Sequence, residues 1–477
     1  MEGVQAGITV KKGEDFSEWY QQILLKADLI DYSPVSGCYV IKPNAYFIWE
    51  QIQAWFDREI KKLGVKNAYF PLFIPESLLK KESKHVEGFA PEVAWVTQGG
   101  NSQLAERLAV RPTSETIMYD SFARWIQSHK ELPFRINQWC NVVRWEFKHP
   151  TPFLRAREFL WQEGHTVHAT KESADEEVFT ILDLYERVFS ELLAIPVIKG
   201  KKSEDEKFAG ALYSTSCEVF LTHGKAVQGC TSHCLGQNFS KAFGIRYLDD
   251  KGNSQFCWQN SWGISTRSLG IAVMMHGDDK GVVLPPRVAF VQVVVVPILF
   301  EQSKNEVLAF AKQVEKLLKH CRVLFDDRQD YTAGWKFNEW EMKGIPIRVE
   351  VGPKDVEKKQ AVVVRRDTGE KQIIPLDKLG AQITSLLELI QKELYDRAKA
   401  FLTENTVYAG SWKQFEEAAS KGALVKADWC ENSSCHEKIK EKTGTKCLTL
   451  SLSEIPENNC VQCGSPAKEV AYFAKSY

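Results

Sequence analysis

Charged and aromatic side chains alternate along two segments, residues 142–148 and 157–165. In a β-strand, residues two apart share a face. One face of the first segment would carry Arg144, Glu146 and Lys148. One face of the second would carry Arg157, Phe159, Trp161, Glu163 and His165. A loop over residues 149–156 joins the two segments, which predicts an antiparallel hairpin.

This predicted hairpin has the side-chain types of a nucleotide pocket. A guanidinium such as Arg144 binds phosphate, and the face also offers carboxylates to a ligand amine. An aromatic ring such as Phe159 can stack on a base. The alternative is an amphipathic hairpin with its polar face in water. That alternative does not explain why aromatic rings share a face with charges, so we expect a binding site.

Polar residues also stand beside other predicted elements. Arg267 follows two possible N-caps, Ser265 and Thr266, and so lies in the first turn of the next predicted helix. A cation is unfavourable beside the positive end of a helix dipole, and an anionic ligand would offset that cost. The role of two further features is open between function and structure. Residues 226–236 have the composition of a polar turn, and Thr113 can cap a helix.

Five of the twelve cysteines lie in the last 48 residues. Four of them form two close pairs, Cys430 with Cys435 and Cys460 with Cys463. Two close pairs on separate loops are a usual arrangement for tetrahedral structural zinc. The wide spacing of the first pair leaves Cys447 and His436 as competing ligands. Four unligated thiols are the alternative to a metal.

Composition restricts the class of protein. The chain has 477 residues, 44% hydrophobic and 26% charged, as in globular proteins with buried cores. A formal net charge of −1 gives no general attraction to nucleic acid or membranes. The longest apolar run, residues 288–299, is too short to span a bilayer. The N-terminus resembles neither a secretory signal nor a mitochondrial transit peptide, so we expect a cytoplasmic protein without membrane contact.

The pattern of elements predicts an α/β multidomain protein with parts at residues 1–286, 287–402 and 403–477. Helical patterns cover residues 16–27, 44–63 and 174–194 of the first part. The second part alternates strand and helix from 287 to 351 and ends in a helix over 378–402. Such alternation predicts a compact domain with a partly parallel sheet.

Together these segments resemble the class II aminoacyl-tRNA synthetases, and among them the prolyl-tRNA synthetases of the eukaryotic and archaeal type. The resemblance covers nearly the whole chain. Its motifs are residues 85–97, 111–116, 137–149, 153–165, 236–239 and 260–263. It implies an antiparallel catalytic sheet flanked by helices, then an α/β anticodon-binding domain with residues 325–335 as its recognisable stretch, then a small zinc-binding domain. Residues 69–75 correspond to motif 1, which implies a homodimer, the Arg144–Glu163 hairpin to motif 2, and residues 263–270 to motif 3.

The implied reaction joins L-proline to tRNA(Pro) through a prolyl-adenylate made from ATP with Mg²⁺. The resemblance implies Arg144 and Arg267 as the catalytic cations. The implied ATP-binding residues are Arg144, Glu146, Arg155, Phe159, Gln228, Thr231 and Arg267. The implied proline-binding residues are Thr113, Glu115, Arg144, Phe159, Trp161, Glu163, His233 and Ser261. Structural zinc is expected on Cys430, Cys435, Cys460 and Cys463.

Two other functions would use a similar fold. An inactive RNA-binding paralogue would be expected to lack a motif arginine or the aromatic stack, and Arg144, Phe159 and Arg267 are present. The second rival is an enzyme for threonine, serine or glycine, against which the apolar face of Phe159 and Trp161 argues. A threonine enzyme would be expected to use a catalytic metal, and no suitable Cys/His set is apparent, although Cys230, His233 and Cys234 are close enough to test. The 64 residues from Gly164 to Val227 are too few for an inserted editing domain. Membership of a multi-synthetase assembly stays open.

Overall fold

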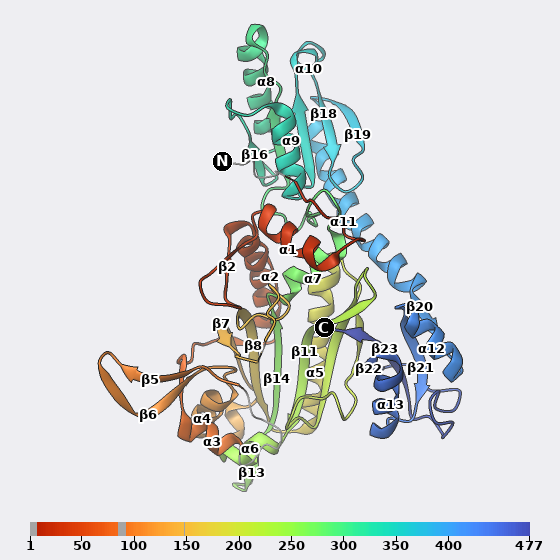
Figure 1. Cartoon of the computed structure of the whole chain (residues 1–477). Coiled ribbons are helices and arrows are strands. Elements are labelled where there is room, and N and C mark those ends of the chain that lie inside the picture. Colours follow the sequence, from red (N-terminus) through yellow and green to blue (C-terminus); the bar gives the residue numbers. More distant parts are fainter. Residues whose placement is uncertain (1–6, 84–91, 147) are drawn as a thin grey trace.

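The computed structural model describes residues 7–83, 92–146 and 148–477 (Figure 1). Residues 85–91 of the first resemblance motif and residue 147 of the predicted hairpin therefore lie outside the described residues. No helix in the described ranges has the length and apolar character needed to cross a membrane.

A single large sheet runs through the lower body in Figure 1. Among the described residues it contains eleven strands, in the order β20-β21-β23-β22-β9-β10-β11-β14-β8-β7-β3. From β9 to the β3 edge its strands are β9 (Ile198–Lys201), β10 (Tyr213–Phe220), β11 (Lys225–Gly236), β14 (Trp258–Ser265), β8 (Glu158–His168), β7 (Phe134–Val143) and β3 (Lys66–Asn67). The pairs from β9 to β7 are all antiparallel, as predicted for the catalytic fold.

Helices cover this sheet. They include α1 (Phe16–Lys26), α2 (Pro43–Lys62), α5 (Lys171–Arg187) and α7 (Arg267–His276). In α2 the buried Ile48, Ile52, Phe56 and Ile60 recur every four residues and so form one stripe. α5 packs against β10, β11 and β14. The helices predicted over 16–27, 44–63 and 174–194 are confirmed, although the third ends at Arg187 and continues as a π-helical turn, Val188–Leu192.

Smaller elements surround the sheet. They are β1 (Ile30–Tyr32), β2 (Tyr39–Ile41), β4 (Phe73–Pro75), α3 (Glu76–Ser83), β5 (Trp95–Gly99), β6 (Ser102–Val110), α4 (Glu115–Trp125), α6 (Asn238–Phe243), β12 (Arg246–Leu248) and β13 (Ser254–Phe256). Strands β4, β6 and β5 form a separate antiparallel sheet.

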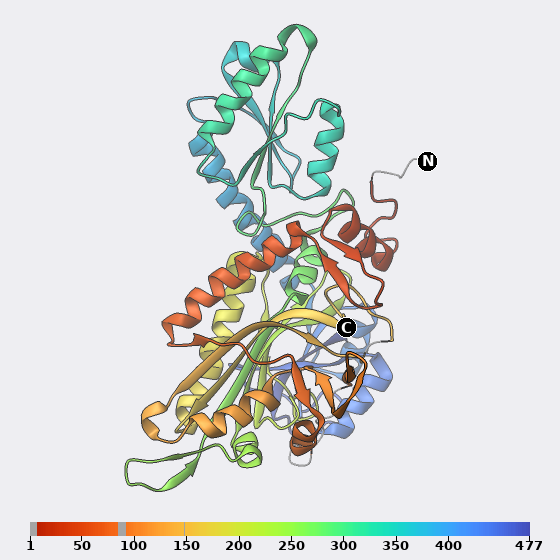
Figure 2. The same cartoon turned by 90° about the vertical axis from the view of Figure 1, so that its left-hand side faces the viewer.

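A second sheet stands apart from the first, with helices on its two sides (Figure 2). Its order is β16 (Val323–Phe325), β15 (Val293–Pro297), β17 (Ile347–Val351), β18 (Gln360–Arg365) and β19 (Lys371–Pro375). Its helices are α8 (Lys304–Leu317), α9 (Ala333–Met342), α10 (Pro353–Lys358) and α11 (Leu379–Glu404). β15 is parallel to β16 and β17, whereas β18 pairs antiparallel on both sides, so the predicted partly parallel sheet is confirmed.

The cysteine-bearing tail is joined to the central sheet. Its elements are β20 (Thr406–Tyr408), α12 (Trp412–Ser420), β21 (Leu424–Trp429), α13 (Ser433–Thr443), β22 (Lys446–Ser451) and β23 (Glu469–Ser476). β22 pairs with β9, and the end of β23 pairs with the start of β11. The sequence predicted a small tail domain, and the structure shows that its strands extend the central sheet.

Candidate active site and four-cysteine cluster

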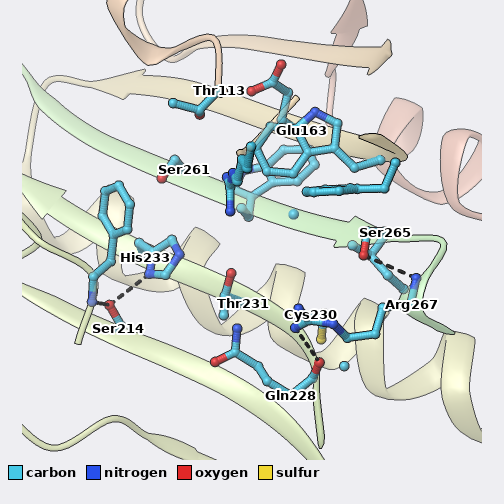
Figure 3. A pocket seen from close by; sticks show the side chains of 18 of the residues that line it. Thr113, Glu163, Ser214, Gln228, Cys230, Thr231, His233, Ser261, Ser265 and Arg267 are labelled. Atoms are coloured by element: carbon cyan, nitrogen blue, oxygen red, sulfur yellow. Dashed lines mark hydrogen bonds between the residues drawn. The ribbon is translucent and has the colours of Figure 1, made fainter. Parts of the chain in front are cut away.

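A cavity of about 480 Å³ lies over strands β8, β11 and β14 (Figure 3). It collects side chains from separate parts of the chain: the start of α4, the β7–β8 hairpin, β11, and the β14–α7 turn. The predicted site residues that line it are Thr113, Glu115, Arg144, Glu146, Phe159, Trp161, Glu163, Gln228, Thr231, His233, Ser261 and Arg267. The antiparallel sheet therefore brings together residues that are more than 150 positions apart.

Strand register explains why these side chains meet. His233 is paired with Ser261 across β11 and β14, and Ser261 is paired with His165 across β14 and β8. In the next row of the same strands, Thr231 is paired with Gly263, and Gly263 with Glu163. Directly opposite residues of adjacent antiparallel strands lie side by side, so each row crosses the floor of the cavity.

Glu163 is the centre of a buried hydrogen-bond network. It accepts from the Ser114 backbone N–H at 3.2 Å, from the Ser114 hydroxyl, and from Gln138 Nε2 at 2.9 Å. His165 Nε2 lies 3.2 Å from Glu163 Oε2, and His165 Nδ1 lies 3.0 Å from the Tyr119 hydroxyl. All these donors are fixed before a ligand arrives, so the carboxylate is oriented in advance.

Glu163 and Glu115, two acidic residues of the cavity, have pKa values shifted in opposite directions. Burial favours the protonated form of Glu163, but hydrogen bonds from His165, Ser114 and Gln138 outweigh burial and lower its pKa. Burial raises the pKa of Glu115, and the nearby charge of Glu163 raises it further. Glu163 is therefore the carboxylate that stays ionised most readily.

The start of α4 differs from the prediction that Thr113 caps the helix. Ser114, and not Thr113, is the N-cap residue, and its side chain makes no cap hydrogen bond. Its hydroxyl donates to Glu163, while the Thr113 hydroxyl donates to Glu115. Both hydroxyls thus point to the carboxylates of the cavity, although Ser114 holds the position where a hydroxyl usually caps the helix.

Cations and aromatic rings line the rest of the cavity. The Arg144 guanidinium carbon lies 5.6 Å from the Phe159 ring centre and 5.2 Å from that of Trp161. Arg144 Nε donates to the Pro112 carbonyl at 2.9 Å. The two rings meet edge to face, with centres 6.0 Å apart. This arrangement holds one guanidinium beside a ring face on which a base can stack.

Arg267 is held at the first residue of α7, as the sequence predicted. Its Nη1 donates to the Gln228 carbonyl and its Nε to the Leu154 carbonyl, both at 3.3 Å. Burial lowers the pKa of Arg267 to about 10, and the charges of Arg144 and Arg155 act in the same direction. Like charges collected at a helix N-terminus form a site for an anion.

His233 stays neutral at the far side of the cavity (Figure 3). Burial lowers its pKa to about 3, and the charge of Lys202 adds to the effect. Its Nδ1 lies 2.8 Å from the Ser214 hydroxyl, and its ring centre lies 4.9 Å from that of Phe208. A neutral ring with one nitrogen engaged is suited to shape the cavity rather than to carry charge.

The predicted hairpin is confirmed, with two corrections. β7 ends at Val143, so Arg144 and Glu146 lie in an irregular segment and not in a strand. One more backbone bond follows, from the Arg144 N–H to the Arg157 carbonyl at 2.7 Å, while the Trp145 N–H faces the other edge and donates to the Glu92 carbonyl at 2.9 Å. Arg157 was also expected on the face of Phe159; its guanidinium instead lies 4.6 Å from the Trp145 ring centre.

Arg155 differs from the other predicted site residues. It does not belong to the described residues that line the cavity, and its side chain is exposed. It is still close enough to Arg267 to lower the pKa of that residue. A role for Arg155 at the phosphates stays a prediction.

Sequence reasoning gave no role to three residues of the site. His165 had been placed on the correct face by the alternation of β8, and that pattern was the signal. Ser114 lies within a predicted motif but was not singled out. Lys202 also lines the cavity, and it had no local signal because its partners are distant in sequence.

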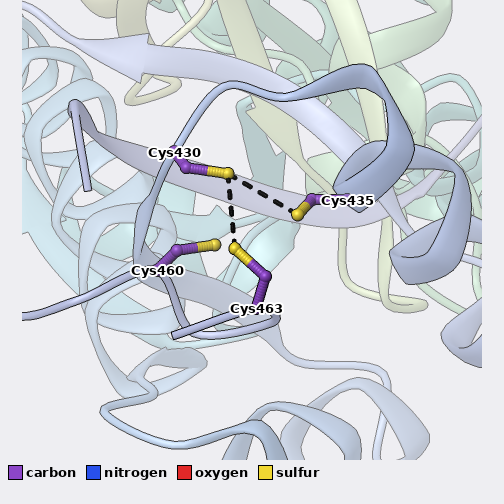
Figure 4. A group of neighbouring side chains, drawn as sticks. All are labelled: Cys430, Cys435, Cys460 and Cys463. Atoms are coloured by element: carbon purple, nitrogen blue, oxygen red, sulfur yellow. Dashed lines mark hydrogen bonds between the residues drawn. The ribbon is translucent and has the colours of Figure 1, made fainter. Parts of the chain in front are cut away.

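The four predicted cysteines of the tail converge (Figure 4). The Sγ of Cys430 lies 3.5 Å from that of Cys435 and 3.8 Å from that of Cys463. All four sulfurs, including that of Cys460, lie within 4.8 Å of one another. Zinc bound to four thiolates at about 2.3 Å needs sulfur–sulfur distances of about 3.8 Å, so the cluster has the size of such a site.

The competing ligands lie elsewhere. His436 directs Nδ1 to Asp205 at 3.3 Å, and its Nε2 accepts from the Cys447 backbone N–H at 3.3 Å. The alternative metal set in the cavity is also not assembled, because His233 and Cys234 are adjacent in β11 and point to opposite faces.

Comparison with known protein families first defines the class. Residues 95–276 match the tRNA synthetase class II core domain (G, H, P, S and T), and residues 292–386 match an anticodon binding domain. Residues 412–477 match the C-terminal domain of prolyl-tRNA synthetase. The catalytic fold and its cavity are thus those of a class II aminoacyl-tRNA synthetase.

Individual relatives define the family within that class. The chain is 48% identical to the cytoplasmic proline–tRNA ligase of Arabidopsis thaliana, covering 99% of this chain and 91% of that one. It is 50% identical to proline–tRNA ligase 2 of Bacillus cereus, covering 100% and 99%. The crystal structure of prolyl-tRNA synthetase from Cryptosporidium parvum, complexed with halofuginone and AMPPNP, matches with a TM-score of 0.96 and 48% identity, covering 99% and 100% of the two chains. The chain therefore belongs to the prolyl-tRNA synthetase (proline–tRNA ligase) family.

The stretch expected to be too short for an editing domain is filled by core elements. Between Gly164 and Val227 the chain forms the end of β8, α5, the π-helical turn, β9, β10 and the start of β11. All residues of this stretch are described, and the class II core match continues across it.

Proposed function

We propose that this protein carries out the proline–tRNA ligase reaction in two steps within the cavity. In the first step the carboxylate of L-proline attacks the α-phosphate of ATP, giving prolyl-adenylate and pyrophosphate. In the second, a terminal ribose hydroxyl of tRNA(Pro) attacks the prolyl carbonyl and AMP leaves. Neither step needs a protein nucleophile, because positioning and charge stabilisation are sufficient.

The observation that carries this proposal is the division of the cavity into two ends. An ionised, hydrogen-bonded carboxylate at Glu163 suits the secondary ammonium of proline. The guanidiniums of Arg144 and Arg267 suit the phosphates of ATP. Both ends belong to one cavity, so the two substrates can meet there.

ATP is assigned to the arginine end. Arg144 contacts the α-phosphate, Arg155 and Arg267 contact the outer phosphates, and Phe159 stacks on adenine. Glu146, Gln228 and Thr231 complete the contacts with the nucleotide. Mg²⁺ bound with ATP supplies further neutralisation of phosphate charge.

Proline is assigned to the Glu163 end. Thr113, Glu115 and Arg144 hold its polar groups. The pyrrolidine ring is lined by Phe159, Trp161, Glu163, His233 and Ser261. Thr113, Glu115, Glu163 and Ser261 are already buried, whereas the arginine, the two rings and His233 are half-buried, which favours a small, compact substrate.

Aminoacylation of a tRNA(Pro) transcript with radiolabelled proline tests the proposed function. We expect prolyl-tRNA to form only when ATP and Mg²⁺ are present. A transcript with another anticodon serves as the control, since the match at residues 292–386 implies anticodon contact. Failure to charge tRNA(Pro) under these conditions would contradict the proposal.

We also propose that Cys430, Cys435, Cys460 and Cys463 hold one structural zinc ion, which would stabilise the fold of the tail. Metal analysis should find about one zinc per chain. Cys460→Ser is expected to lose the zinc, and Cys447→Ala, outside the cluster, is expected to retain it. Retention of zinc by Cys460→Ser would overturn this assignment.

Residues 69–75 are proposed as part of a homodimer interface. Tyr69 is 72% exposed and Phe73 is 44% exposed. Exposed aromatic rings so close together are typical of a protein contact. Light scattering should give the mass of a dimer, and Phe73→Asp should shift it towards the monomer.

We further propose that the chain is divided into domains at residues 1–286, 287–402 and 403–477. We also propose a cytoplasmic location, like that in the name of the Arabidopsis relative.

A further inference from the structure

Lys202, which lines the cavity, belongs to a buried ion pair to which the proposed reaction gives no role. Lys202, directly after β9, is 5% exposed, and Glu218 of β10 is 2% exposed. Lys202 Nζ donates to Glu218 Oε1 at 2.6 Å, and Ser216 Oγ donates to the same oxygen at 2.7 Å. Removing one member of such a pair leaves the other as an uncompensated buried charge.

Glu218 lies beside the arginine of the phosphate end. Across the β10–β11 ladder it is paired with Gln228, whose carbonyl accepts from Arg267. The Glu218 carboxylate raises the pKa of Arg267, against the larger lowering by burial and by Arg144. Glu218 therefore acts on two cations: Lys202, which it contacts, and Arg267, whose guanidinium contacts backbone carbonyls.

A second partner of Lys202 comes from the tail. Its Nζ also donates to the Leu448 carbonyl at 2.7 Å. Leu448 lies in β22, the tail strand that pairs with β9. One ammonium group thus connects the cavity wall, the carboxylate next to Arg267 and the C-terminal part of the chain.

We propose that Lys202 is a positioning residue for ATP binding. Lys202 neutralises Glu218, and the Arg267 guanidinium therefore stays directed to the outer phosphates. Because Lys202 also donates to the Leu448 carbonyl, its position depends on the tail. Without Lys202, Arg267 is the cation left beside Glu218, and an ion pair between them takes the guanidinium away from ATP. The inference rests on the proposed function, because it requires Arg267 to bind phosphate.

Proline-dependent ATP–pyrophosphate exchange by the zinc-loaded 477-residue chain tests this role. In Lys202→Met we expect KM for ATP to rise about tenfold. KM for proline should change by less than about twofold, since the amine end is untouched. The double variant Lys202→Met/Glu218→Gln removes both charges, and its KM for ATP should return to within about threefold of the unsubstituted protein.

Lys199→Met is the matched control. Lys199 lies on β9, three residues before Lys202, and pairs with Asp183 at 2.6 Å and with Glu186 at 2.7 Å. It does not belong to the described lining of the cavity. Loss of this lysine should leave both KM values unchanged.

Two results would overturn the inference. An unchanged KM for ATP in Lys202→Met would restrict the pair to a role in stability. A KM that stays raised in the double variant would mean that Lys202 acts on ATP directly and not through Glu218. If Lys202→Met does not fold, Glu218→Gln and the double variant decide: both should keep KM for ATP within about threefold, and a larger rise in either overturns the inference.

The same assay separates this inference from the proposed function. If the unsubstituted protein shows no proline-dependent exchange, the proposed function itself fails, and the inference fails with it. If that protein exchanges normally and only the variants behave otherwise than expected, the inference alone is lost.

Discussion

The two ends of the cavity handle charge in different ways. Around Glu163, the protein supplies the partners itself: a histidine, a hydroxyl, an amide and a backbone N–H surround one carboxylate. Around Arg267, the guanidinium contacts the carbonyls of Leu154 and Gln228, and the nearest charges that lower its pKa are other arginines.

This difference indicates how each substrate is recognised. The amine end is complete before binding, so it selects by shape and by hydrogen-bond geometry. At the phosphate end the arginines repel one another, and an anionic ligand relieves that repulsion. Binding of ATP is therefore stabilised by the neutralisation of these charges. Each end should therefore respond to substitution in its own kinetic parameter.

The largest expected effect is at the phosphate end. Arg267→Ala should lower proline-dependent ATP–pyrophosphate exchange about 100- to 1000-fold, because it removes a fixed cation from the developing phosphate charge. KM for proline should change little. Arg246→Ala, whose guanidinium stacks on Phe256 at 3.8 Å, is the control and should retain activity. If Arg267→Ala keeps its activity within about tenfold of the unsubstituted protein, the role assigned to Arg267 at the phosphate end is contradicted.

The next largest effect is the selection of proline over alanine by the apolar surfaces of the amine end. Alanine lacks two ring carbons of proline, and each methylene in an apolar pocket discriminates by about 10- to 200-fold. We expect slow but measurable alanine-dependent exchange. Because core elements fill residues 164–227, we also expect no hydrolysis of alanyl-tRNA by the pure protein. Detection of such hydrolysis would contradict the account.

Glu163→Gln should affect the amine end alone. KM for proline should rise about 10- to 100-fold, because a charge-assisted hydrogen bond to the ammonium becomes a neutral one. KM for ATP should stay the same. Glu158→Gln, on the same strand but exposed, is the matched control. Equal changes in both KM values would mean that the ends are not separate.

The smallest effects are on stability, with opposite signs for two neighbouring carboxylates. The raised pKa of Glu115 means that its ionised form costs stability above about pH 4.5. The lowered pKa of Glu163 means that its ionised form stabilises above pH 4.5, and that this stability is lost as the pH falls. At pH 7.5 without ligand, Glu115→Gln should raise the melting temperature and Glu163→Gln should lower it. Both differences should shrink towards pH 4; shifts of the same sign would contradict the pKa assignments.

Local patterns predicted much of the site. The alternation of residues 157–165 predicted β8 and the shared face of Phe159, Trp161, Glu163 and His165, because period two is a property of the strand itself. The spacing of the tail cysteines predicted the four-cysteine cluster because the two members of each pair are close in sequence. Cys435 itself lies in the first turn of α13.

Features that depend on distant partners were not predictable from the sequence. The backbone hydrogen bond from the Trp145 N–H to the Glu92 carbonyl joins residues some 50 positions apart. The pairing of β22 with β9 joins residues about 250 positions apart. No local pattern marks Lys202, whose partners Glu218 and Leu448 are brought to it only by the fold.

The central claim is that one cavity activates proline with ATP. Amino-acid-dependent ATP–pyrophosphate exchange, run in parallel with proline, alanine, threonine, serine and glycine, tests it most directly. The account predicts strong exchange with proline, weak exchange with alanine, and much less with the other three. No exchange with any of the five, from folded and zinc-loaded dimer, would contradict it.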